Sequence, residues 1–204
     1  MKKYLLGTKQ GMSQYYTDAG LAIPVTVISA GPVTVTQTKD TDKDGYTAVQ
    51  VGYGTQQKDR INKARLGQMK DMGPFRHLKE FRFKLDAHSA NVGDTLDVSQ
   101  FEVGDKLFIS GTSKSKGFQG VVKRHGFHGG PRSHGQKHSE REPGSIGGGL
   151  RNRVPKGMRM AGRTGGDTIT LKNVKVVAVD TENNTILVKG AVPGRKGTLL
   201  ALKA

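Results

Sequence analysis

Lys114 to Gly166 reads KSKGFQGVVKRHGFHGGPRSHGQKHSEREPGSIGGGLRNRVPKGMRMAGRTGG. Between Gly117 and Gly166 it holds ten Lys or Arg, fourteen of the 29 Gly and four of the six His, against two acids, Glu140 and Glu142. Half of the chain's net charge of +16 therefore lies in about a quarter of its 204 residues. Such a segment has almost no apolar surface to bury and cannot build a core of its own. It is either a disordered basic linker or an arm that becomes ordered against a polyanion.

The order of residue types in this stretch favours the arm. Its cations are spread along the chain, and the glycines between them permit positive φ and close backbone approach. Prolines at positions 131, 143 and 155 lower the entropy lost on ordering. Flat side chains that can stack on unpaired bases, Phe118 among them, recur between the cations. We therefore predict contacts to folded RNA from Lys114, Lys116, Lys123, Arg124, His125, Phe127, His128, Arg132, His134, Lys137, His138, Arg141, Arg151, Arg153, Lys156, Arg159 and Arg163.

The composition of the whole chain limits its class and location. A net charge of +16 makes a polyanion the leading partner, and nucleic acid is the commonest one. The absence of Cys excludes disulfides and thiolate metal sites and allows a reducing compartment. The opening MKKYLLGTKQGM does not match a signal peptide, and the longest apolar run, Leu21–Ala30, is too short to span a membrane. We expect a cytoplasmic protein with no membrane partner.

Outside the arm, the sequence predicts short strands. Segments that are rich in Val, Ile, Thr and Tyr, or that alternate apolar and polar residues, lie at 3–6, 12–16, 23–28, 33–38, 46–53, 80–85, 96–98, 107–110, 168–170, 174–180 and 185–189. In the segment 80–85 the alternation directs Phe81, Phe83 and Leu85 inward. Turn-rich short strands at this spacing indicate a small β-barrel. Because the pattern resumes after the arm, the arm interrupts the β domain instead of trailing from it.

Two segments between these strands are not predicted to be strands. Asp40–Gly45 matches the start of a calcium loop, D-x-D-x-D-G, but Val51 stands at the twelfth position, where a bidentate Glu is required. We interpret this segment as a polar hairpin turn. Lys58–Met69 carries the one helical pattern, which is short and basic. Its cations form either a solvated face or a second contact with phosphates.

These patterns together predict a mainly β fold. The expected body is a small closed β-barrel assembled from residues 1–112 and 167–204, with a short helical insertion at about 57–73. The long irregular basic extension, rich in Gly, comprises residues 113–166.

Catalytic and metal chemistry find weak support in the sequence. The four His of the arm are the only candidate metal ligands. A zinc site of four His without Cys or carboxylate would be unusual, and the surrounding basic residues repel a cation. No phosphate-binding G-x-x-x-x-G-K-[ST], nucleophile G-x-S-x-G or dinucleotide motif occurs. We predict no cofactor, no metal and no catalytic residue. Two alternatives stay open: an RNA-acting enzyme that uses the arm His, and a basic nucleic-acid-compacting protein.

Several motifs give the chain a resemblance to the L3 family of large-ribosomal-subunit proteins, in its bacterial form. The resemblance runs collinearly over essentially the full length. The motifs are LLGTKQGM (Leu5–Met12), YTAVQVGYG (Tyr46–Gly54), EFR (Glu80–Arg82), SGTSKSKGFQGVVKRHGFHGGPRSHG (Ser110–Gly135), EPGSIGGG (Glu142–Gly149), MAGRTGG (Met160–Gly166) and ILVKGAVPGRKG (Ile186–Gly197).

The resemblance implies a barrel of the translation-protein type whose loop passes through ribosomal RNA toward the peptidyl-transferase centre. It implies early assembly, binding near the 3′ end of the large-subunit RNA, contact with neighbouring large-subunit proteins, and no small-molecule substrate. It places the loop tip at Gly144, Ser145, Ile146, Gly147, Gly148 and Gly149. Some bacterial relatives carry a methylated Gln directly after GSIG, where this chain has Gly148, so that modification should be missing.

Overall fold

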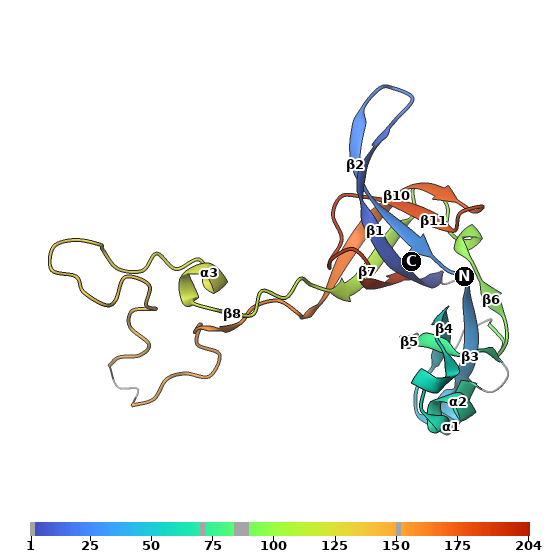
Figure 1. Cartoon of the computed structure of the whole chain (residues 1–204), viewed down its shortest axis with the longest axis horizontal. Coiled ribbons are helices and arrows are strands. Elements are labelled where there is room, and N and C mark those ends of the chain that lie inside the picture. Colours follow the sequence, from blue (N-terminus) through green and yellow to red (C-terminus); the bar gives the residue numbers. More distant parts are fainter. Residues whose placement is uncertain (1–2, 70–71, 84–89, 150–151) are drawn as a thin grey trace. The chain divides into compact units, whose positions relative to one another are not determined.

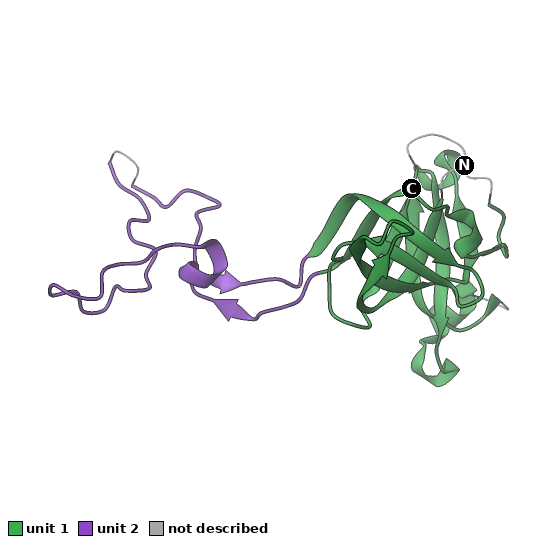
Figure 2. Ribbon diagram, turned by 90° about the horizontal axis from the view of Figure 1, so that it is seen from above, with its two compact units in different colours: residues 1–112, 168–204 green, residues 113–167 purple. Residues whose placement is uncertain are grey.

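The computed structural model describes residues 3–69, 72–83, 90–149 and 152–204. Contacts divide the chain into two compact units, coloured separately in Figure 2. Unit 1 comprises residues 1–112 and 168–204, and unit 2 comprises Ser113–Asp167.

A closed antiparallel barrel forms the centre of unit 1. Within the described residues, it closes in the order β1 (Tyr4–Tyr16), β12 (Leu199–Lys203), β7 (Lys106–Thr112), β10 (Thr168–Asp180), β11 (Thr185–Lys189) and β2 (Ala22–Ala30), with β2 returning to β1 (Figure 1). Burial alternates along the strands, as a closed sheet requires, so that Leu107, Ile109 and Ile186 are fully enclosed. Each such side chain contributes about 1.5–3 kcal/mol by leaving water. The predicted closed β-barrel is confirmed.

A second sheet packs against the barrel within unit 1. Its order is β5 (Phe75–Arg82), β4 (Ala48–Thr55), β3 (Val33–Lys39) and β6 (Thr95–Leu96), all antiparallel. Its buried side chains Val35, Val51 and Phe81 belong to the same apolar cluster as Leu5 and Leu202 of the barrel. The sequence did not separate this sheet from the barrel, because alternation shows that one face is buried but not what covers it.

Several predicted elements differ from the observed ones in extent. The strands predicted at 3–6 and 12–16 are one strand, β1, and Leu85 lies outside the described residues. The segment 96–98 is strand only in β6 and continues into a 3-10 turn, η3 (Val98–Gln100). The predicted turn at Asp40–Gly45 contains one helical turn, α1 (Thr41–Asp44), which ends at Gly45 with φ 77°.

The predicted helix at 58–69 is broken into two pieces. A 3-10 turn, η1 (Lys58–Arg60), precedes the helix α2 (Lys63–Met69). The break falls at Asn62, whose side-chain oxygen accepts a hydrogen bond from Arg65 N at 2.9 Å. Asn favours this capping role over an interior helical position, which explains why α2 begins after it.

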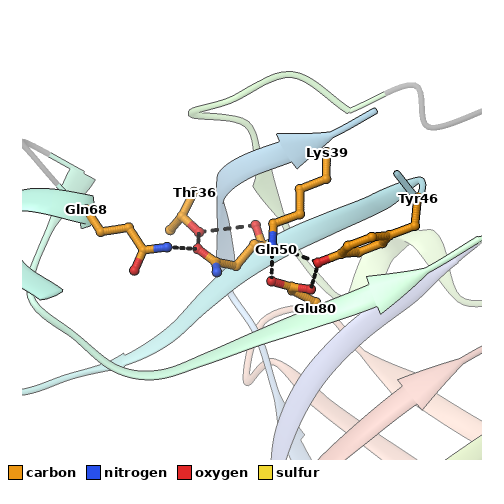
Figure 3. A network of polar contacts seen from close by, with 6 residues as sticks. All are labelled: Thr36, Lys39, Tyr46, Gln50, Gln68 and Glu80. Carbon is orange, nitrogen blue, oxygen red and sulfur yellow. Dashed lines mark hydrogen bonds and ion pairs between the residues drawn. The ribbon is translucent and has the colours of Figure 1, made fainter. Parts of the chain in front are cut away.

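A hydrogen-bond cluster around the buried side chain of Gln50 attaches α2 to the second sheet. The side-chain oxygen of Gln50, a residue that is 7% exposed, accepts bonds from Thr36 Oγ1 at 2.9 Å and from Gln68 Nε2 at 3.3 Å (Figure 3). Because a buried amide left unbonded would cost about 1–3 kcal/mol, these two partners make the polar side chain acceptable there. The cluster joins β3, β4 and the helix through side chains.

An ion pair on the outer surface of the same sheet joins β3 to β5. Lys39 Nζ lies 2.7 Å from Glu80 Oε1, and the Tyr46 hydroxyl accepts from Lys39 and donates to Glu80 (Figure 3). Arg82 stacks over the Tyr46 ring at 4.3 Å. The hydrogen bond from Lys39 lowers the pKa of the Glu80 carboxyl, and the same bond raises the pKa of Lys39.

Replacing this carboxylate should make stability depend less on pH. Because the Glu80 pKa is depressed in the folded state, its contribution is present above the unfolded value of about 4.3 and is lost as pH falls through the folded value. We expect Glu80→Gln to lower Tm by a few degrees at neutral pH and by less near pH ~3. Asp18→Asn, which removes an exposed acid, is the matched control. An equal Tm difference at both pH values would contradict this assignment.

Candidate nucleic-acid interface

A paired neck, Ser113–Gln119 with Gly162–Asp167, begins and ends unit 2. Its backbone bonds run from Ser113 N to Asp167 O, from Lys116 N to Thr164 O and from Thr164 N to Gly117 O, each at 2.9 Å. The neck ends in the short ladder of β8 (Phe118–Gln119) and β9 (Gly162–Arg163). Its predicted RNA contacts are exposed: the cations Lys114, Lys116 and Arg163, and also the Phe118 ring, which is 74% exposed.

A short helix that the sequence analysis missed follows the neck. α3 (Val121–His125) places Lys123, Arg124 and His125 in its last turn and ends at Gly126 with φ 74°. Cations at a helix C-terminus are favoured by the helix dipole. The available signal was the pair of Val followed by basic residues and Gly, which is too short for a periodicity argument.

The helix is attached to the returning chain by two side chains. Arg124 Nη1 donates to Met160 O at 2.7 Å, and His125 Nε2 donates to the same oxygen at 3.0 Å. Because a carbonyl oxygen can only accept, His125 carries its hydrogen on Nε2. A Cβ at Gly162 would lie 2.5 Å from Arg124 Nη1, so a larger residue there would displace the guanidinium from this position. Arg124 and His125 therefore shape the arm as well as presenting charge and a ring.

Beyond the helix, aromatic and basic groups surround a hollow of about 550 Å³. His125 and Phe127 lie with ring centroids 5.9 Å apart. The hollow is also lined by His128, Arg159 and Glu142. Flat rings beside a guanidinium are the elements that hold an unstacked base and its phosphate.

Backbone and side-chain hydrogen bonds hold another side of this hollow. Gly130 N donates to Glu140 O at 3.0 Å, and Gln136 Nε2 donates to Ser139 Oγ. A Cβ built on Gly129, whose φ is +74°, would overlap the Glu140 carbonyl oxygen. Arg132 lies 3.7 Å from the Glu140 carboxylate, with its side chain 82% exposed. The two passes of the chain thus approach as closely as only glycine permits.

The predicted tip is exposed throughout Gly144–Gly149. Ser145 Oγ donates to Gly147 O at 2.8 Å, and Ile146 is 40% exposed. Of the remaining predicted contacts, the structure leaves His134, Lys137, His138, Arg141, Arg153 and Lys156 exposed along the arm. Arg151 lies outside the described residues.

Unit 2 differs from an ordinary domain in how few apolar side chains its described residues bury. Among its described residues Val121, at 2% exposure, is the one buried apolar side chain, and none of them belongs to the main apolar cluster. The described residues contain no group of three or more His, Cys, Asp or Glu that could hold a metal, and no helix long and apolar enough to cross a membrane. The surface of unit 2 offers exposed positive charge and rings on a backbone with almost no core.

The chain is similar to known proteins over nearly its whole length. The family model described as ribosomal protein L3 matches residues 75–185. The chain is 48% identical over 207 residues to the large ribosomal subunit protein uL3c of Guillardia theta, covering 100% of both chains. It is 50% identical to uL3 of Herpetosiphon aurantiacus, covering 96% of this chain and 93% of the relative. With uL3 of Natranaerobius thermophilus it shares 47% identity, covering 99% and 96%.

Proposed function

The chain belongs to the ribosomal protein L3 family, and from that premise we propose that unit 2 binds large-subunit ribosomal RNA and takes its working shape from it. Members of this family are structural constituents of the large ribosomal subunit and not enzymes. The alternative of an RNA-acting enzyme is therefore set aside.

The observation that carries the proposal is the near absence of buried apolar side chains among the described residues of so cationic a segment. Val121 alone cannot offset the conformational entropy of ordering unit 2. Phosphates packed against the exposed cations would supply the missing free energy, since neutralisation releases the counter-ions condensed on the RNA. The glycines at positive φ allow the backbone to approach the RNA closely.

The finer parts of the proposal concern where the arm lies. We assign the tip, Gly144–Gly149, to the neighbourhood of the peptidyl-transferase centre, and the binding site to the region near the 3′ end of the large-subunit RNA. The role in assembly follows if RNA helices close around the arm early. Support comes from the family membership and from the small, exposed residues of the tip.

The salt dependence of RNA binding tests this proposal. Each phosphate contact contributes a slope of about −0.7 to −0.9 in log K against log salt. We expect the triple variant Arg132→Ala, Arg141→Ala, Lys156→Ala to lower the magnitude of the slope by about two to three units on purified large-subunit RNA. A control triple on the barrel strands, Lys106→Ala, Lys172→Ala, Lys175→Ala, removes equal charge.

Footprinting on the same RNA completes the test. The arm should protect nucleotides near the 3′ end, and the arm variant should lose that protection while the control triple keeps it. An unchanged slope in the arm variant would contradict the proposal. Equal binding to duplex DNA would instead favour the nucleic-acid-compacting alternative.

A further inference from the structure

In unit 1, β1 and β2 continue past the barrel as a two-stranded ribbon, here called the β1–β2 ribbon, residues 11–24 (Figure 1). β12 pairs with β1 only at Tyr4–Thr8, and β11 pairs with β2 only at Val25–Ser29. At the base of the ribbon, Gly190 N donates to Pro24 O at 2.8 Å. Beyond that bond, within the described residues, the strands of the ribbon pair only with each other, and their outer edges are open. An open edge is a natural site for a partner, and an isolated two-stranded ribbon is marginally stable.

One face of the ribbon is apolar and exposed. In the register Gln14 is opposite Pro24 and Tyr16 is opposite Ala22, so these residues and Met12 share a face. Met12 is 54% and Tyr16 60% exposed, and Ala22 and Pro24 are exposed as well. The amide of Gln14, which lies between Met12 and Tyr16 on this face, donates to the Tyr16 hydroxyl at 2.8 Å.

The tip that joins the two strands is held by its own hydrogen bonds. Thr17 N donates to Leu21 O at 3.0 Å, and Gly20 N donates to Thr17 O at 2.8 Å. Leu21 is 67% exposed at this tip. The apolar groups are thus presented on a structured ribbon, which lowers the entropy that a partner must overcome on binding.

Charge distinguishes this surface from the rest of the protein. Residues 10–38 contain no Lys, Arg or His, the longest stretch without Lys or Arg in a chain of net charge +16, and their one acid is Asp18. An RNA-binding surface requires cations for phosphates, and the ribbon has none of its own. Exposed Tyr and Met with little charge match the composition of protein interface cores.

We propose that the β1–β2 ribbon is a docking surface for another protein, which covers Met12, Tyr16 and Leu21 with an apolar, uncharged strip of its own. This inference rests on the proposed function, since the partner is taken to be a neighbouring protein of the same particle. It assigns to the ribbon a protein partner, while unit 2 meets the RNA.

Photo-crosslinking in assembled particles tests the proposal. The chain is made with benzoylphenylalanine at Tyr16, incorporated into large subunits, irradiated and treated with ribonuclease. We expect one discrete heavier product that resists ribonuclease and contains peptides of a single other protein. The same probe at Val103, a 70% exposed residue elsewhere in unit 1, is the control and should give less of that product. A product that contains RNA or two copies of this chain, or no product, overturns the inference.

A substitution pair gives an independent measurement. Met12→Ser with Tyr16→Ser should leave the affinity of the free chain for large-subunit RNA unchanged, because the ribbon carries no cation. In direct competition with the parent chain, its occupancy in large subunits should fall about tenfold, the size of a hot-spot loss. A fall in RNA affinity, or equal occupancy, overturns the inference. A parent chain that does not enter the particle overturns the proposed function, and this inference with it.

Discussion

Deleting Gly126–Gly157, with two glycines joining the cut ends, should leave unit 1 folded and remove most of the salt-dependent binding to large-subunit RNA. Among the described residues, the main apolar cluster lies entirely in unit 1, so the deletion removes none of its side chains. The cut ends are close, because His125 Nε2 donates to Met160 O at 3.0 Å. A short joint can therefore close the neck without distorting it.

The expected effect on binding is large because the deleted segment holds six Lys or Arg. If each contacts a phosphate, the slope of log K against log salt changes by about four to five units. The Tm of unit 1 should stay within a degree or two of the parent value. Subunits assembled with the deleted chain should mature slowly or be less active.

Two measurements decide this prediction. Thermal unfolding reports on unit 1, and titrations at several salt concentrations report on the arm. A Tm that drops by ten degrees or more would mean that the arm supports the barrel, against the two-unit organisation. A retained slope would mean that the neck and unit 1 make the phosphate contacts.

The sequence was most informative where one strand buries alternate side chains. β7 and β11 fall close to their predicted positions because their apolar residues alternate cleanly. β12 was missed because LLALK consists mainly of good helix formers without β-branched residues. It becomes a strand by pairing with β1 on one side and β7 on the other, a long-range effect that no local window contains.

For the candidate site, the sequence identified which residues carry charge and rings but not how they meet. Composition is sufficient to predict an exposed cationic arm, since such residues have nothing to bury. It could not show that Arg124 and His125 both donate to Met160, or that Phe127 and Arg159 line one hollow. These contacts depend on the path by which the chain returns to the neck. The positions of the Gly residues permit that path but do not specify it.

A pair of substitutions, one in each unit, should separate folding from RNA binding. Leu202→Ala empties a fully buried position on β12 and should destabilise unit 1 by about 2–5 kcal/mol. For a body of this size the Tm should fall by about 2–4 °C for each kcal/mol. At temperatures where the barrel is still folded, the salt slope of RNA binding should not change, because the arm cations are untouched.

Gly129→Ala should have the opposite effect to Leu202→Ala: it should weaken RNA binding and leave the stability of unit 1 unchanged. Its Cβ would overlap the Glu140 carbonyl oxygen, and its φ of +74° is unfavourable for Ala, so the two passes of the arm must separate. Gly135→Ala is the matched control, because Gly135 has φ +81° but a Cβ there meets nothing within 4 Å. We expect Gly129→Ala to weaken RNA binding about tenfold more than Gly135→Ala, with Tm unchanged in both. Equal losses would mean that backbone conformation, and not the Gly129–Glu140 approach, sets the affinity; a Tm loss in Gly129→Ala would mean that the arm and barrel unfold together.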